Sequence, residues 1–196
     1  RHYADVVPRV CDLVASQFGR DADANVVLVR DALRRACDEL PAETELQSLR
    51  RVLLGRAIDA DVVLDLHCDN EAVLHLYSAT HLWPQVEPLA RLLGAEVSLL
   101  ADVSGDDPFD EACSTVWPRL AEFLSQRLGQ PVLLPDACIA VTVELRGEAD
   151  VSHELAAADA EALIEYLAGR GFVDRAPAPL PALKRGPTPL AGSMPV

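Results

Sequence analysis

The first third of the chain carries apolar residues at helical spacing. One amphipathic helix is predicted from Tyr3 to Phe18, and a second runs from Val26 to Leu40, with Asp21 or Asp23 available as its N-terminal cap. A third helix is predicted after Pro41. Its inward residues are expected to be Leu46, Leu49, Leu53 and Ile58, and its solvent-facing residues Arg50, Arg51 and Arg56.

From residue 62 onward, short apolar runs alternate with helical patterns. The predicted strands are 62–67, 73–77, 96–101 and 138–145. The predicted helices are 84–93, a helix that begins at Asp107-Pro108 and is bent by Pro118, and a final helix from the Ser152 cap to Leu167. Strands that alternate with helices indicate an α/β fold, with a mixed, mainly parallel sheet flanked by helices.

The composition changes at Arg175. The segment from there to Val196 holds six of the fourteen prolines, which excludes a helix or a central strand. We therefore expect a catalytic-type α/β domain over residues 1–174 and a Pro-rich linker or arm over residues 175–196.

Charge and cysteine usage narrow the class of protein. A formal net charge of −14 without a cluster of Lys and Arg argues against nucleic acid and against an anionic membrane surface as partners. No apolar run reaches the length of a membrane span. The five cysteines form no CxxC pair, so free thiols in a reducing, cytoplasmic compartment are expected. The sequence leaves open whether the protein forms a homo-oligomer.

Ionisable residues appear abruptly where two apolar strands end. Asp65 and His67 lie at the end of the first strand, and Glu144 lies at the end of the strand that begins at Cys138. Strand ends are where open α/β sheets carry chemistry, so His67 is a candidate metal ligand and Glu144 a candidate general base. Structural roles are the alternatives: a hydrogen-bonded strand-end histidine, and an ion pair between Glu144 and Arg146 or another arginine.

Asp65 lies two residues before His67 and therefore on the same strand face, where it can orient the imidazole or cap a buried turn. His75 shares a face with Tyr77 and is expected to be a half-buried, hydrogen-bonded histidine. No HxxxH or HExxH pair occurs, so the chain by itself supplies no complete zinc-ligand set. GxSxG, P-loop and GxGxxG motifs are absent as well.

Three short segments in this order resemble the succinylglutamate desuccinylase/aspartoacylase family of the zinc carboxypeptidase superfamily. They are the VLDLH strand ending in His67, the VTVEL strand containing Glu144, and the opening RHYAD, which is similar to the end of an N-R segment. The family's first two zinc ligands come from an upstream HxxE motif that these residues do not contain. The resemblance therefore implies an internal portion of a longer protein, with a β-rich domain following the Pro-rich arm.

The resemblance implies a zinc-dependent deacylase that cleaves the amide bond of an N-acyl amino acid or a similar small acylated amine. His67 would be the third zinc ligand, Asp65 its supporting partner, Glu144 the general base, and Arg1 the group that binds a substrate carboxylate. Two alternatives remain: a metallocarboxypeptidase-type peptidase, and a non-catalytic binding domain that has lost the metal.

Overall fold

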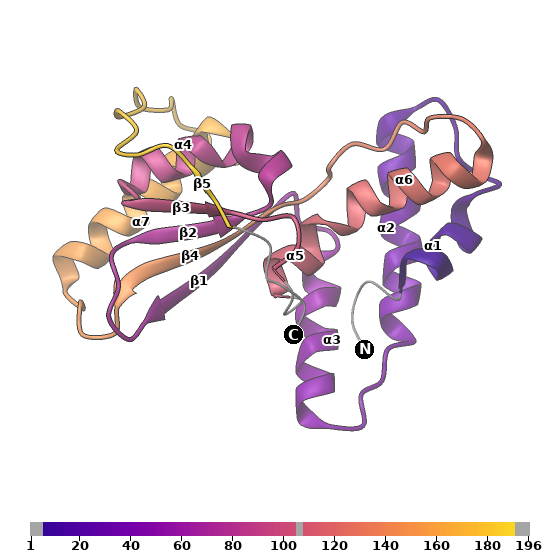
Figure 1. Cartoon of the computed structure of the whole chain (residues 1–196), viewed down its shortest axis with the longest axis horizontal. Coiled ribbons are helices and arrows are strands. Elements are labelled where there is room, and N and C mark those ends of the chain that lie inside the picture. The colour runs from indigo at the N-terminus through magenta and orange to yellow at the C-terminus, as the bar shows by residue number, and fades with distance from the viewer. Residues whose placement is uncertain (1–5, 105–107, 191–196) are drawn as a thin grey trace. The chain divides into compact units, whose positions relative to one another are not determined.

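Among residues 6–104 and 108–190, which the computed structural model describes, five helices form the first of two units (Figure 1). This helical unit comprises residues 1–63 and 106–140. Its helices are α1 (Val6–Val14), α2 (Ala22–Asp38), α3 (Glu45–Ala57), α5 (Phe109–Ser114) and α6 (Val116–Leu128). The three helices expected before residue 60 are therefore present.

Side-chain caps and a proline set the ends of these helices. The Asp21 carboxylate accepts a hydrogen bond from the Ala24 N–H at 3.0 Å, which confirms one of the two predicted caps of α2. Thr44 and Gln47 form a capping box at the start of α3. Asp107 lies outside the described residues. The bend predicted from Pro118 appears as a break between α5 and α6, because proline offers no N–H to the preceding turn.

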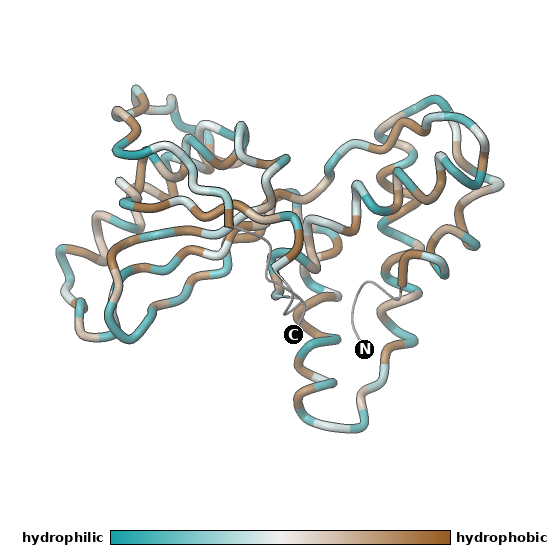
Figure 2. Tube along the Cα trace, in the orientation of Figure 1, coloured by the Kyte–Doolittle hydropathy of each residue, from teal (hydrophilic) through white to brown (hydrophobic). Residues whose placement is uncertain are grey.

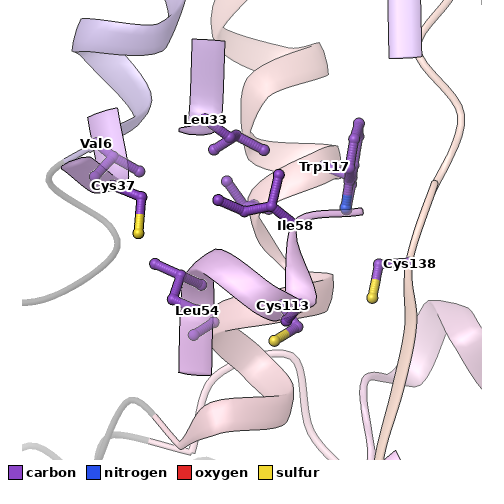
Figure 3. Close-up of a pocket in the computed structure, with 11 residues that line it drawn as sticks. Val6, Leu33, Cys37, Leu54, Ile58, Cys113, Trp117 and Cys138 are labelled. Atoms are coloured by element: carbon purple, nitrogen blue, oxygen red, sulfur yellow. The ribbon is translucent and has the colours of Figure 1, made fainter. Parts of the chain in front are cut away.

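The core of the helical unit is apolar and almost filled. Trp117, Leu120 and Leu124 of α6 are fully buried with Val10 and Val29. A cavity of about 20 Å³ remains beside Trp117 (Figure 3), enough for one water-sized sphere and too small for a substrate. Its labelled lining residues are Val6, Leu33, Cys37, Leu54, Ile58, Cys113, Trp117 and Cys138.

Four of the five cysteines are buried free thiols, and Cys68 is exposed. Burial raises the pKa of the Cys138 thiol to about 12 and that of Cys11 to about 11, because a thiolate would lose its hydration there. These buried sulfurs are therefore protonated core residues, not nucleophiles.

Helix α3 contradicts the prediction for its inward face. Ile58, just past its end, is buried as expected, but Leu46, Leu49 and Leu53 are exposed. The buried side of α3 is formed instead by Leu54 and Ala57. Because apolar residues occur on two sides of this helix, their spacing does not identify the side that packs.

The second unit comprises residues 64–105 and 141–196 and contains most of a five-stranded sheet. The strand order is β1-β4-β2-β3-β5. The strands are β1 (Val62–Asp69), β2 (His75–Ser78), β3 (Val97–Leu100), β4 (Ile139–Gly147) and β5 (Thr188–Pro189). Strand β3 is parallel to β2 and β5, whereas β2 and β4 are antiparallel.

Strands β1 and β4 run in the same direction. The Ile139 N–H donates to the Asp61 carbonyl at 2.9 Å where the two strands begin, and the Glu148 N–H donates to the Asp69 carbonyl at 2.8 Å where they end. With this pair, parallel neighbours outnumber antiparallel ones. The predicted mixed, mainly parallel sheet is confirmed.

Helices α4 (Trp83–Leu93) and α7 (His153–Gly169) lie together on one side of this sheet (Figure 1). The fully buried Leu76, Val141 and Val143 supply the apolar face of the strands. The short 3-10 helix Thr80–Leu82 leads into α4. The Ser152 hydroxyl caps α7 as predicted, accepting a hydrogen bond from the Leu155 N–H at 3.1 Å.

The Pro-rich segment forms no helix over its described length and contributes only β5, which pairs at the edge of the sheet. Side chains of the second unit hold this segment in place. Arg91 donates to the Pro181 carbonyl at 2.6 Å, and Lys184 pairs with Glu96 at 2.6 Å. No helix in the described part of the chain is both long and apolar enough to cross a membrane.

Candidate active site

Glu144 faces His75 across two antiparallel strands. The register of β2 and β4 pairs His75 with Glu144 and Tyr77 with Thr142. Directly paired residues point to the same side of a sheet, and residues two apart on one strand share a face. These four side chains therefore lie on the same face, opposite the one formed by Leu76 and Val143.

The same face continues onto β1. The hydrogen bond from the Ile139 N–H to the Asp61 carbonyl pairs Val62 with Ile139. Five residues further along each strand are His67 and Glu144, which places these two residues side by side. Strand β4 lies between β1 and β2, so Glu144 has His67 on one side and His75 on the other.

Asp65 is positioned to orient His67. Its Oδ1 lies 3.0 Å from His67 Nε2, and the two side chains are 28% and 49% exposed. When Nε2–H donates to this carboxylate, Nδ1 presents a lone pair that can bind a metal. The sequence predicted this contact from the two-residue spacing, although the metal-binding role of His67 stays a prediction.

Glu144 carries a buried oxygen, Oε2, that has no hydrogen-bond partner in the part of the chain that the structure describes. The structural alternative, an ion pair with Arg146, does not apply. Both terminal nitrogens of Arg146 donate hydrogen bonds to the Asp159 carboxylate, each at 2.8 Å. A buried carboxylate oxygen is costly to leave unpaired, so Glu144 is suited to receiving a proton or a polar ligand.

Tyr77 completes the polar face next to Glu144. Burial raises the pKa of the Tyr77 hydroxyl, and the negative charges of Glu144 and Asp69 raise it further. Tyr77 therefore keeps its proton and can donate it in a hydrogen bond. The sequence placed Tyr77 and His75 on one face but could not show that this face meets Glu144, because that depends on which strands are neighbours.

His75 is held by its surroundings, as the sequence predicted. Its Nδ1 lies 2.8 Å from the Val73 carbonyl oxygen, and its ring meets Tyr77 edge-on with centroids 5.3 Å apart. His75 is buried, with 8% exposure. It therefore forms one fixed wall beside Glu144.

A bulge follows Glu144, the candidate general base, on β4. Arg146 has φ +83°, in the left-handed region, and the flanking hydrogen bonds show one more residue on β4 than on β1. Gly147 comes next, where an added Cβ would lie only 3.1 Å from the Asn70 carbonyl oxygen. Pairing of β4 with β2 ends at Glu144, whereas its pairing with β1 continues past Arg146 to Glu148.

The described residues fit one part of a zinc site. No three His, Cys, Asp or Glu side chains in residues 6–104 and 108–190 converge closely enough to hold a metal by themselves. His67 supplies one nitrogen ligand backed by Asp65, and the unpaired Glu144 oxygen is next to it. Arg1, predicted to bind substrate, lies outside the described residues.

The arrangement of strands and helices is the zinc-carboxypeptidase-like α/β fold. Its structural neighbours are succinylglutamate desuccinylase/aspartoacylase family proteins. One, from Shewanella amazonensis SB2B, matches 89% of the chain with a TM-score of 0.67 and 24% identity. Another, from Shewanella frigidimarina NCIMB 400, matches 82% with a TM-score of 0.65 and 24% identity.

The chain spans about half the length of these solved structures, 47% and 43% respectively. Its sequence matches no protein-family model and no curated protein. At this level of identity the likeness shows the fold.

Proposed function

We propose that the protein is a zinc-dependent hydrolase that cleaves the amide bond of an N-acyl amino acid or a similar small acylated amine. The observation that carries this proposal is the half-buried Glu144, whose Oε2 has no hydrogen-bond partner among the described residues, beside the Asp65–His67 pair. The names of the two structural neighbours, desuccinylase and aspartoacylase, support amide hydrolysis of small acylated amino acids as the reaction class.

His67 is the proposed metal ligand, and Asp65 orients its imidazole ring. The Asp65 carboxylate accepts a hydrogen bond from His67 Nε2–H, which fixes the tautomer in which Nδ1 is the ligand. Zinc, when bound, polarises the substrate carbonyl and makes a water acidic enough to be deprotonated near neutral pH. Two further ligands are required to complete a catalytic zinc site of three protein ligands.

Glu144 moves the proton. Its carboxylate accepts a proton from the attacking water and then delivers it to the amine that leaves. Its place between β1 and β2 holds it beside His67, and the buried His75 and the half-buried Tyr77 lie on its other side. Arg1 would bind the substrate carboxylate through the two hydrogen bonds of its guanidinium group.

We expect the zinc-loaded protein to hydrolyse N-succinyl, N-acetyl or related acyl amino acids at least about tenfold more efficiently than dipeptides with the same C-terminal residue. A site that recognises a small acyl group leaves a buried polar contact unmade when a peptide replaces it. Steady-state kcat/KM values for matched pairs of substrates, measured on the longest form of the protein that carries this chain, test the expectation.

The alternatives correspond to specific outcomes of that measurement. A preference for peptides, with release of the C-terminal residue, would show that the protein is a metallocarboxypeptidase-type peptidase. Binding of acyl amino acids without turnover, in protein that takes up no zinc, would support the non-catalytic binding domain that has lost the metal and overturn the proposed reaction.

A further inference from the structure

Tyr77 carries a hydroxyl group that forms no hydrogen bond within the described part of the chain. The other described tyrosine, Tyr166, donates its hydroxyl to the Gln85 carbonyl oxygen at 3.2 Å. The Tyr77 oxygen has no such partner among residues 6–104 and 108–190, and it does not belong to the fully buried polar atoms. The Tyr77 hydroxyl is therefore open to a ligand.

Neighbouring side chains restrict the Tyr77 ring. His75 meets this ring edge-on, with an interplanar angle of 72°, and is itself anchored to the Val73 carbonyl oxygen. Leu99 of β3 pairs with Tyr77 from the opposite side. A ring held in this way loses little conformational entropy when its hydroxyl binds a ligand, which favours a binding role.

Tyr77 also lies close to Glu144. In the register of β2 and β4, Tyr77 is opposite Thr142, so Glu144 is its diagonal neighbour on the same face. Figure 2 shows hydrophobic and hydrophilic residues alternating along the strands of this sheet, as expected when one face is polar. Burial, and then the charge of Glu144, raise the pKa of the Tyr77 hydroxyl, which therefore stays protonated and able to donate.

From the position of β1, Tyr77 lies beyond Glu144. The strand order is β1-β4-β2, and neighbouring strands are about 4.8 Å apart, so roughly 10 Å separates β1 from β2. In the reaction proposed above, the carbonyl oxygen of the substrate lies at the metal beside His67, and the amide nitrogen lies within reach of Glu144. The amino acid attached to that nitrogen then extends over β2.

We propose, resting on the proposed function, that Tyr77 is a substrate-binding residue whose hydroxyl donates a hydrogen bond to a side-chain oxygen of this amino acid. Arg1 is assigned to the substrate carboxylate, so the acceptor for Tyr77 is a further oxygen of the same amino acid. The substrate class is an N-acyl amino acid with an oxygen-bearing side chain, such as asparagine, aspartate, glutamine or glutamate. Apolar amino acids of the same size leave the Tyr77 hydroxyl without its acceptor and are poorer substrates.

Size-matched pairs of substrates test this contact. One pair is N-acyl asparagine and N-acyl leucine, and the other is N-acyl glutamine and N-acyl methionine, all with the same acyl group. For the zinc-loaded protein, kcat/KM should be at least about tenfold higher for the oxygen-bearing member of one or both pairs. Tyr77→Phe removes only the hydroxyl, so it should bring that ratio close to one, mainly by raising KM for the oxygen-bearing substrate.

Tyr166→Phe is the matched control, because it removes a hydroxyl that already has a partner. This variant should lower the urea midpoint of unfolding and leave the substrate ratio as in the wild type, whereas Tyr77→Phe should change the ratio and leave the midpoint. A wild-type ratio near one in both pairs, or a ratio that Tyr77→Phe does not change, would overturn the Tyr77 contact even if the protein is an active deacylase.

Calorimetric titration with the same four compounds separates the Tyr77 contact from the proposed reaction. If the protein binds them without hydrolysing them, the proposed reaction is wrong. The contact is then judged from the ratio of the Kd values within each pair, which Tyr77→Phe should again bring close to one. If none of the four compounds binds, the contact and the proposed reaction are both wrong.

Discussion

Glu144→Gln is expected to lower kcat by about 10² to 10⁴-fold while leaving the zinc content unchanged. Glutamine has nearly the same shape as glutamate, so the strand and its neighbours His67 and His75 stay in place. Its neutral amide cannot accept the proton of the attacking water. The measurement is steady-state hydrolysis of an N-acyl amino acid by the zinc-loaded protein, with zinc determined on the same samples.

Glu148→Gln provides the matched control, because this residue is exposed and lies just beyond the end of β4. It should retain activity close to that of the wild type. If Glu144→Gln kept more than a tenth of the wild-type kcat, the role of Glu144 as general base would be wrong, whatever the substrate.

Arg146→Ala is expected to destabilise the protein by about 3 kcal/mol, near the lower end of the cost of breaking a buried ion pair. The two hydrogen bonds from Arg146 to Asp159 hold side chains that are only 21% and 11% exposed. Removing the guanidinium leaves the Asp159 carboxylate buried without its partner. Urea unfolding, followed by circular dichroism, measures the loss.

Two further variants separate the ion pair from the backbone. Arg146→Gly should recover about 1 kcal/mol relative to Arg146→Ala, because glycine adopts the observed φ of +83° without strain. Lys184→Ala, which breaks the exposed pair with Glu96, should cost less than about 1 kcal/mol. Small and equal losses in the free energy of unfolding for Arg146→Ala, Arg146→Gly and Lys184→Ala would contradict a structural role for the Arg146–Asp159 pair.

Four of the five strands in the described sheet could be predicted because each is a short apolar run with a clear end, whereas β5 lies in the Pro-rich segment, where no strand was predicted. The runs leading to His67 and Glu144 correspond to β1 and β4, although both strands extend two residues further than expected. Strand β2 is shorter than its apolar run and begins at His75. Strand ends depend on pairing with neighbours, which a single run of residues does not encode.

The candidate site could be predicted only in part. The spacing of Asp65 and His67 was sufficient to place them on one strand face, as the 3.0 Å contact between them bears out. The arrangement of His75 and Tyr77 beside Glu144 required the strand order, in which a late strand inserts between two early ones. Long-range order of this kind has no local signal in the chain.

The outward leucines of α3 and the bulge at Arg146 were missed for different reasons. Helix α3 has apolar residues on two sides, so either side could pack. A positive φ at an arginine is unfavourable locally and is maintained only by tertiary contacts, here with Asp159. Neither feature follows from residue preferences.

Zinc content is the measurement that tests the central proposal most directly. Mass spectrometry of the native protein, on the 196-residue chain and on any longer form that carries it, should find about one zinc per chain in the form with a complete ligand set. His67→Ala should remove that zinc, whereas His153→Ala, an exposed histidine at the start of α7, should not. Zinc that persists in His67→Ala, or no zinc in any form of the protein, would contradict a metal site at the end of β1.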